Sequence, residues 1–240
     1  MSMLKETGLE QIAPRTSCEP LSVRPPAEAG RFSEVLSPGA LTFTAVLASR
    51  FEGERQRLVA QRPALAQARG DERHSSTREA VFMRESPWKL AQAPTRCQTR
   101  TVSPGEFQLS AGARRDGETL LVVDFGGEPE TSFDLVMLGH RNLREAARGQ
   151  DVGRASALAL CPRPFDLQDP HFRTAEEPLG AALVDVALYL FHCAHAASRR
   201  GSSPHVCLSG LHHHLEARWW CRLIEAAEHT LGLARGAIEV

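Results

Sequence analysis

Short apolar runs that alternate with helical stretches from about residue 100 onward constrain the fold more than any other feature. Residues 120–123 (LLVV) form one run, which ends at Asp124. Residues 155–160 form a second run before Cys161-Pro162-Arg163-Pro164, and residues 205–208 form a third. Strands buried on both faces have this composition, because a parallel sheet covered by helices shows neither face to water. The alternation predicts a parallel α/β architecture, as a barrel or an open sheet.

Helices are expected around these strands. Apolar positions at helical spacing occupy residues 183–194 and 220–231, and the glycines at 232 and 236 end the second stretch. Ser37-Pro38 predicts the start of an earlier helix, since a hydroxyl cap precedes a proline at the first helical position. Residues 50–73 are interpreted as a separate, largely solvated helix, and residues 237–240 as the start of another strand.

Composition excludes several classes of protein. The chain has 240 residues and a formal net charge of -1, which gives no reason to expect nucleic acid or an anionic membrane as partner. No run approaches 18 consecutive apolar residues, so no membrane span is expected, and the N-terminus carries no secretory signal. The six cysteines are spread widely and never form a CxxC pair, which indicates reduced thiols in an intracellular protein.

Three candidate site residues follow strand ends, where parallel α/β proteins hold reactive groups. Asp124 ends an apolar strand, where a carboxylate needs a partner or a function. Arg163 lies between two prolines and could bind a carboxylate, or it could be a surface loop residue. Cys161 could act as a nucleophile only if a base or a positive charge stabilised its thiolate.

Histidine clusters do not predict a metal site. Successive helical residues point about 100° apart, so the run at residues 212–214 has no common focus and is interpreted as a partly exposed helix start. His192 and His195 share a helix face, but no acidic residue or cysteine completes a ligand set. We therefore expect no metal site from the residues alone.

Several motifs in collinear order from about residue 34 to 240 resemble the malate synthase family, in its A-type branch. Residues 182–192 (ALVDVALYLFH) resemble the family's "SLFDFGLYFFHN", and residues 231–238 (LGLARGAI) resemble "LGIPRGTI". Further similar runs are residues 35–41, 142–146, 200–204 and 214–220, with Ser76-Thr77-Arg78-Glu79 and Trp88 in the connector.

The resemblance implies an N-terminal helical clasp and the first, incomplete part of a TIM-type β/α barrel. It divides the chain into a flexible N-terminal segment (1–33), a helical clasp and connector (34–98) and a partial barrel with an inserted segment (99–240). It also implies the glyoxylate-cycle reaction, in which acetyl-CoA, glyoxylate and water give malate and CoA with Mg²⁺ as cofactor. The compartment is cytoplasmic or peroxisomal (glyoxysomal), and the oligomeric state is unassigned.

Departures from the family pattern matter more than the matches. The family's catalytic arginine, first in "RxRG", is Cys161 here, and only Arg163 matches the second arginine. Gly126 and Gly127 replace two carboxylates of "DFED", and a lysine is replaced by glycine at position 210. By resemblance the metal ligands and the aspartate base lie beyond Val240, so we interpret the chain as C-terminally truncated.

These departures predict that the chain binds Mg²⁺ and acetyl-CoA poorly and is inactive. No cofactor-binding residue is assigned, no metal ligand is expected up to Val240, and Arg163 and Asp124 are the catalytic candidates. The alternatives are a non-catalytic interaction module, or degenerate gene product, that keeps the half-barrel, and an unrelated thiol enzyme that uses Cys161.

Overall fold

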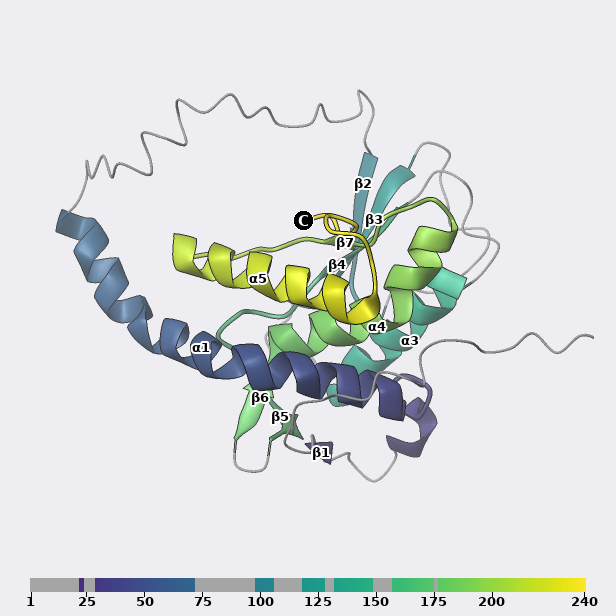
Figure 1. Ribbon diagram of the computed structural model, residues 1–240, viewed down its shortest axis with the longest axis horizontal. Helices are drawn as coiled ribbons and strands as arrows, with labels where there is room; N and C mark the ends of the chain where they lie inside the picture. Colours follow the sequence, from purple (N-terminus) through teal and green to yellow (C-terminus); the bar gives the residue numbers. More distant parts are fainter. Residues whose placement is uncertain are drawn as a thin grey trace, which may run out of the picture.

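The computed structural model describes residues 22–23, 29–71, 98–105, 118–127, 132–148, 157–174 and 177–240. Figure 1 shows a parallel sheet with helices packed on one side of it. The elements of these segments are β1 (Ser22–Val23), η1 (Ala29–Phe32), α1 (Pro38–Asp71), β2 (Gln98–Val102), β3 (Glu118–Asp124), α3 (Phe133–Arg148), β4 (Ala157–Cys161), β5 (Gln168–Arg173), β6 (Pro178–Gly180), α4 (Ala181–Arg199), β7 (His205–Val206) and α5 (His214–Leu231).

The main sheet has four parallel strands in the order β2-β3-β4-β7. The three apolar runs predicted as strands are β3, β4 and β7, so those predictions and the parallel α/β class are confirmed. The sheet is open in the described part of the chain.

Residues 237–240, predicted as the start of a further strand, lie beside β7. Glu239 forms a parallel bridge with His205, and its N–H donates to the Pro204 carbonyl at 3.0 Å. The bridge is isolated, so a full strand is not formed here. Val240 follows it and is 71% exposed, which leaves the last residue without a place in the core.

Strand residues alternate between two unequal faces. Val123, Leu158, Leu160 and Val206 belong to the main apolar core beneath the helices. The opposite face carries a small cluster of Val122, Ala159 and Cys161, with Leu120 and Cys207 against it. Side chains alternate along a strand, so each strand contributes to both faces and residues at strand ends share a face with their neighbours across the sheet.

Helix α4 is the centre of the core, with residues 181–190 all buried. Tyr189 ties it to the sheet, because its hydroxyl donates to the Leu158 carbonyl at 2.8 Å and accepts from the His205 N–H at 3.2 Å. This helix is long and apolar enough to match a membrane span, but 78% of it is buried within the protein, as expected for a central core helix.

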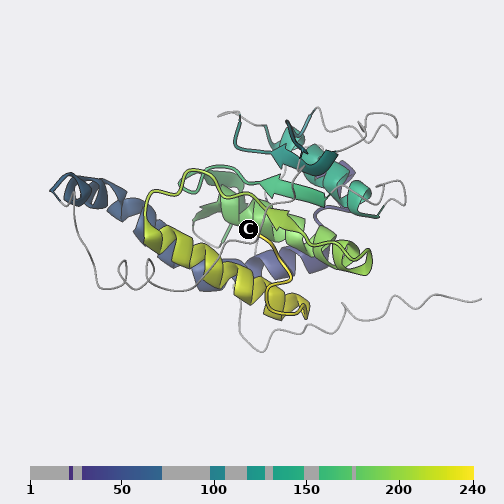
Figure 2. The same ribbon diagram turned by 90° about the horizontal axis from the view of Figure 1, so that it is seen from above.

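Helix α1 crosses the outside of α4 and α5 (Figure 1), and it lies beside α5 in the view from above as well (Figure 2). Its start at Pro38 confirms the prediction from Ser37-Pro38. The prediction of a separate helix from residue 50 is wrong, since one helix of 34 residues continues through Pro63. Packing explains the continuity: Phe51 and Leu58 are buried, and the Trp219 indole N–H donates to the Phe51 carbonyl at 3.0 Å.

A small antiparallel sheet, β1-β5-β6, lies beside α1 and was not predicted. The buried carboxylate of Glu52 joins it to the helix by accepting from the Gly180 N–H and from Arg55. Arg55 also donates to the Phe165 carbonyl. The expectation of a flexible N-terminal segment falls mostly outside the described residues, and the connector at 72–97 lies wholly outside them.

Candidate functional site

Asp124, Cys161 and Cys207 form a row at the carboxyl ends of three neighbouring strands. Asp124 pairs with Cys161 in the register of β3 and β4, and the Phe125 N–H donates to the Cys161 carbonyl at 2.9 Å. Leu160 pairs with Val206, so Cys207 is the next residue across from Cys161. We call Asp124, Cys161, Cys207 and nearby Ser209 the strand-end row. Two of the three candidate residues, Asp124 and Cys161, are therefore brought together.

The Asp124 carboxylate is half-buried and fixed by the turn that follows β3. Its Oδ1 accepts from the Gly126 N–H at 2.8 Å. A Cβ added at Gly126 or Gly127 would lie 3.4 Å from an Asp124 carboxylate oxygen, and one at Gly126 only 3.2 Å from the Pro162 carbonyl oxygen. The turn therefore lies close to Asp124, and a side chain at Gly126 would crowd the Pro162 carbonyl.

The Cys161 thiol is buried, and its Sγ lies 3.6 Å from the Ser209 hydroxyl. Burial, with the Asp124 charge as a further contributor, raises the pKa of Cys161 to about 11 although Ser209 opposes this. Burial and Asp124 also raise the pKa of Cys207. A catalytic thiolate needs the opposite environment, with a lowered pKa, so this geometry gives the thiol-enzyme alternative no support.

Arg163 does not join the strand-end row. Its guanidinium donates to Asp185, with Nη2 at 2.7 Å from Oδ1 and Nε at 2.9 Å from Oδ2, and its backbone N–H donates to Oδ2 at 3.0 Å. Nη2 also lies 2.8 Å from Oδ2 of Asp169. Two buried carboxylates therefore bind the guanidinium that was predicted to bind a substrate carboxylate.

The buried charges around Arg163 stabilise one another. Burial alone lowers the pKa of Arg163, but Asp185 and Asp169 outweigh it and raise that pKa. Burial raises the pKa of Asp185, but Arg163 and His140 reverse this and bring it down to about 2. Both groups therefore remain ionised at neutral pH inside the protein.

His140 completes this buried cluster and was missed from the sequence. It is 1% exposed and lies against the Phe125 ring, with its Nε2 3.6 Å from Asp185 Oδ1, too far for a hydrogen bond. The one available signal for the cluster was Asp185, a charged residue within the otherwise apolar residues 181–190. A buried charge in such a helix requires a partner.

The histidines have structural contacts. His213 caps α5 by accepting from the Leu215 N–H, which confirms residues 212–214 as a helix start. His192 is buried and its Nε2–H donates to the Val35 carbonyl at 2.8 Å. Within the described segments no group of three His, Cys, Asp or Glu side chains is arranged to hold a metal ion.

The strand-end row does not fit Mg²⁺. This ion requires near-octahedral oxygen ligands, usually carboxylates and water. The row offers one carboxylate, Asp124, and two protonated thiols. The described residues of this row therefore supply no site that we can assign to the metal. The family ligands that the resemblance places beyond Val240 lie outside this sequence, so their position stays a prediction.

A family model for the TIM barrel domain of malate synthase matches residues 157–240. Malate synthase of Myxococcus xanthus is 32% identical over 226 residues, which cover 87% of this chain. The chain belongs to the malate synthase family. Malate synthase of Arabidopsis thaliana is 28% identical over 86% of the chain, and glyoxysomal malate synthase of Ricinus communis is 29% identical over 87%.

Membership of the malate synthase family identifies the architecture. The open parallel sheet β2-β3-β4-β7 with its helices is an incomplete TIM-type barrel, of which residues 157–240 match the family model. The chain, which ends at Val240, spans about two fifths of the relatives it matches, 41% for the Myxococcus protein and 40% for the Arabidopsis protein.

Proposed function

We propose that this malate synthase family chain lacks the positive charge required for catalysis at its strand ends and does not itself synthesise malate. The family reaction joins acetyl-CoA to glyoxylate. A carboxylate base removes a proton from the acetyl methyl group, the resulting enolate attacks the aldehyde carbon, and water then releases CoA. The negative charge on the enolate oxygen must be stabilised by an arginine or a metal ion.

One observation carries this proposal: Cys161, which the resemblance matches to the family's catalytic arginine, is a neutral thiol beside a carboxylate. Cys161 and Asp124 are paired in register, and the Cys161 pKa of about 11 keeps the thiol protonated at neutral pH. Arg163 cannot substitute, since its guanidinium is held by Asp185 and Asp169. An enolate formed here would meet the like charge of Asp124.

The loss of a single electrostatic stabiliser reduces catalytic rates by roughly 10²–10³-fold. Asp124 remains as a carboxylate that could hold a substrate hydroxyl or water. We propose that the site descends from one that bound glyoxylate and acetyl-CoA as substrates. No step through Mg²⁺ is proposed, because the strand-end row does not fit that ion.

The second candidate is a non-catalytic interaction module that keeps the clasp and half-barrel. It is favoured by the open sheet, in which β2 pairs with β3 alone among the described strands. An unpaired strand edge offers backbone donors and acceptors to another chain. For either function we propose an intracellular location, cytoplasmic or glyoxysomal, since the Ricinus relative is named a glyoxysomal protein.

The test is an assay for free CoA with the purified 240-residue chain, acetyl-CoA, glyoxylate and Mg²⁺. We expect turnover at least roughly 10²–10³-fold below that of the positive control. Turnover on the order of 1–10³ per second would refute the proposal. Thermal unfolding of the same sample shows that the chain is folded, and an authentic malate synthase serves as the positive control.

A further inference from the structure

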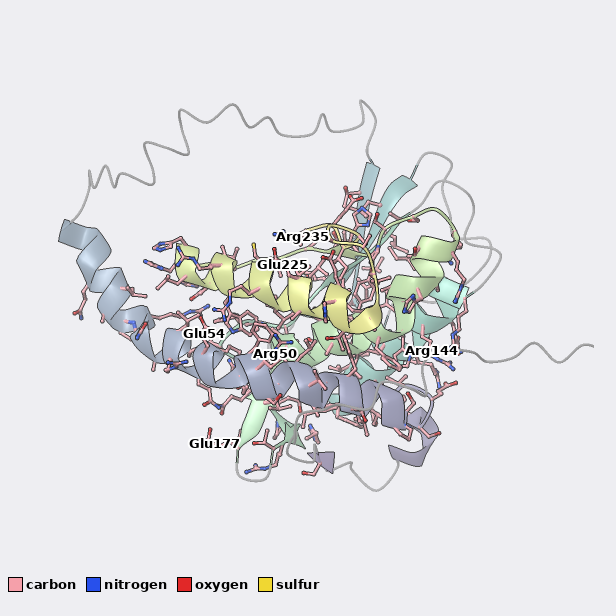
Figure 3. The ribbon with its side chains drawn as sticks, viewed as in Figure 1. Arg50, Glu54, Arg144, Glu177, Glu225 and Arg235 are labelled. Atoms are coloured by element: carbon pink, nitrogen blue, oxygen red, sulfur yellow. The ribbon has the colours of Figure 1, made fainter. Side chains whose placement is uncertain are left out.

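A groove lies between α1 and α5, on the outside of the molecule and away from the strand-end row. Its volume is about 420 Å³, and its lining residues are Arg50, Phe51, Arg222, Glu225, Ala226 and His229. Figure 3 shows Arg50 and Glu54 between α1 and α5, and Glu225 on the side of α5 nearer Arg235. The groove therefore has walls from two helices that are packed together, and it is not a loop surface.

Charges around the groove leave an excess of positive charge. Arg222 Nη1 donates to both carboxylate oxygens of Glu54 at 2.9 Å, so this pair is neutral. Glu225 is paired with Arg235. No carboxylate pairs with Arg50 in the described part of the protein. After the two pairs cancel, Arg50 remains as an uncompensated cation at the rim, and His229 adds a further ring nitrogen that can bind an anion.

The two guanidiniums that line the groove share one aromatic support. The Arg50 and Arg222 guanidinium carbons each lie 5.9 Å from the centroid of the Phe51 ring, which is itself 4% exposed. A cation over an aromatic face loses some of its conformational freedom before any ligand arrives. A bound anion therefore meets donors from both helices that are already close to position.

We propose that this groove binds a small organic phosphate. A guanidinium presents parallel N–H donors that match two phosphate oxygens. Arg50 supplies the net positive charge, and Arg222 adds N–H donors although Glu54 neutralises its charge. The volume exceeds that of inorganic phosphate and leaves room for an organic group beside Ala226. Glu54 competes with the ligand for Arg222 and thereby limits the affinity.

The test is calorimetric titration of the full chain with glycerol phosphate, with succinate and with sodium chloride at equal ionic strength. We expect saturable binding of glycerol phosphate with a Kd on the order of 1 mM or tighter. Arg50→Gln and Arg222→Gln should each weaken it about tenfold or more. Glu54→Gln should tighten it several-fold, because it frees Arg222.

Two matched controls separate the groove from general charge effects. Arg57→Gln removes an exposed arginine from the same helix that does not line the groove, and Glu145→Gln changes an exposed glutamate on α3. Neither should alter the Kd. Absence of saturable binding, equal effects of Arg57→Gln and Arg50→Gln, or succinate binding as tight as glycerol phosphate would each overturn the proposal. Thermal unfolding confirms that every variant is folded.

Discussion

Arg163 and Asp185 form a buried ion pair that crosses from the end of β4 to helix α4. The Arg163 side chain is 7% exposed and that of Asp185 is fully buried, and the backbone N–H of Arg163 joins the same carboxylate. This contact fixes the turn after β4, and with it the position of Cys161 in the strand-end row. Arg163 is therefore best described as a positioning residue.

Asp185→Asn should destabilise the protein by about 3 kcal/mol, because it removes the main partner of the buried Arg163 charge and leaves only Asp169 to compensate it. Urea unfolding of the variant and the wild type measures the difference. Arg235→Gln is the matched control, since the Arg235–Glu225 pair is 85% and 50% exposed and such pairs contribute less than about 1 kcal/mol. Equal effects of the two variants would show that the buried pair is not important for stability.

The same pair predicts an acid-sensitive component of stability. The pKa of Asp185 is lowered from 3.8 to about 2 in the folded chain. A carboxyl group whose pKa is lower in the folded chain stabilises the fold at pH values above its pKa in the unfolded chain. This contribution disappears as the pH falls from about 4 towards 2. Comparison of the unfolding free energies of wild type and Asp185→Asn across this range should show the difference shrinking. A constant difference would contradict the assignment.

His192 should make the protein less stable as the pH falls from 6.5 to about 4. Burial lowers its pKa from 6.5 to about 4, against the hydrogen bond to Val35. Below pH 6.5 the unfolded chain takes up a proton that the folded chain does not, which costs about 1.4 kcal/mol per pH unit until about pH 4. His192→Gln can keep the bond to Val35 and should flatten this slope in urea unfolding at pH 7 and pH 5. An unchanged slope would assign the effect to other groups.

Cys161 should be alkylated slowly by iodoacetamide. A shift of its pKa from 9.0 to about 11 lowers the thiolate fraction at neutral pH roughly a hundredfold. The labelling rate, followed by peptide mass spectrometry, should rise with pH up to about 11. Asp124→Asn should accelerate it, since that carboxylate contributes to the raised pKa. Exposed Cys221 is the internal reference, and equal labelling of both cysteines would revive the thiol-enzyme alternative.

Gly180→Ala should disrupt the junction between α1 and the small antiparallel sheet. A Cβ at this position would lie 2.2 Å from Arg55 Nε, and Arg55 is buried and bound to Glu52. The expected loss is on the order of 2 kcal/mol, measured by urea unfolding. Gly53→Ala is the control of opposite sign: it lies exposed within α1 with no atom near its added Cβ, so it should stabilise by about 0.5–1 kcal/mol.

Local patterns predicted much of the barrel part. The apolar runs at β3, β4 and β7 and the helix start at Ser37-Pro38 were identified because each signal is contained in a few adjacent residues. Gly232, which ends α5 with φ 67°, is a further example. The antiparallel sheet was missed because β5 is the polar sequence QDPHFR, and its pairing of Ser22 with Arg173 joins residues far apart in the chain.

The candidate site was predicted in part for the same reason. Strand ends of a parallel sheet meet at one edge, so Asp124 and Cys161 could be placed together from the order of elements alone. The orientation of the Arg163 side chain could not be predicted. It depends on Asp185, 22 residues later, and on Asp169 in strand β5, which the apolar pattern of the sequence did not predict.

The sequence by itself determined the parallel α/β class and the family, since these depend on residue identity and local spacing. Only the tertiary structure decided that Arg163 is bound internally, that α1 continues past residue 50 and that two helices enclose a basic groove. Those features arise from contacts between distant segments. Burial then determines whether a charged group meets a partner inside the protein or remains available to a ligand.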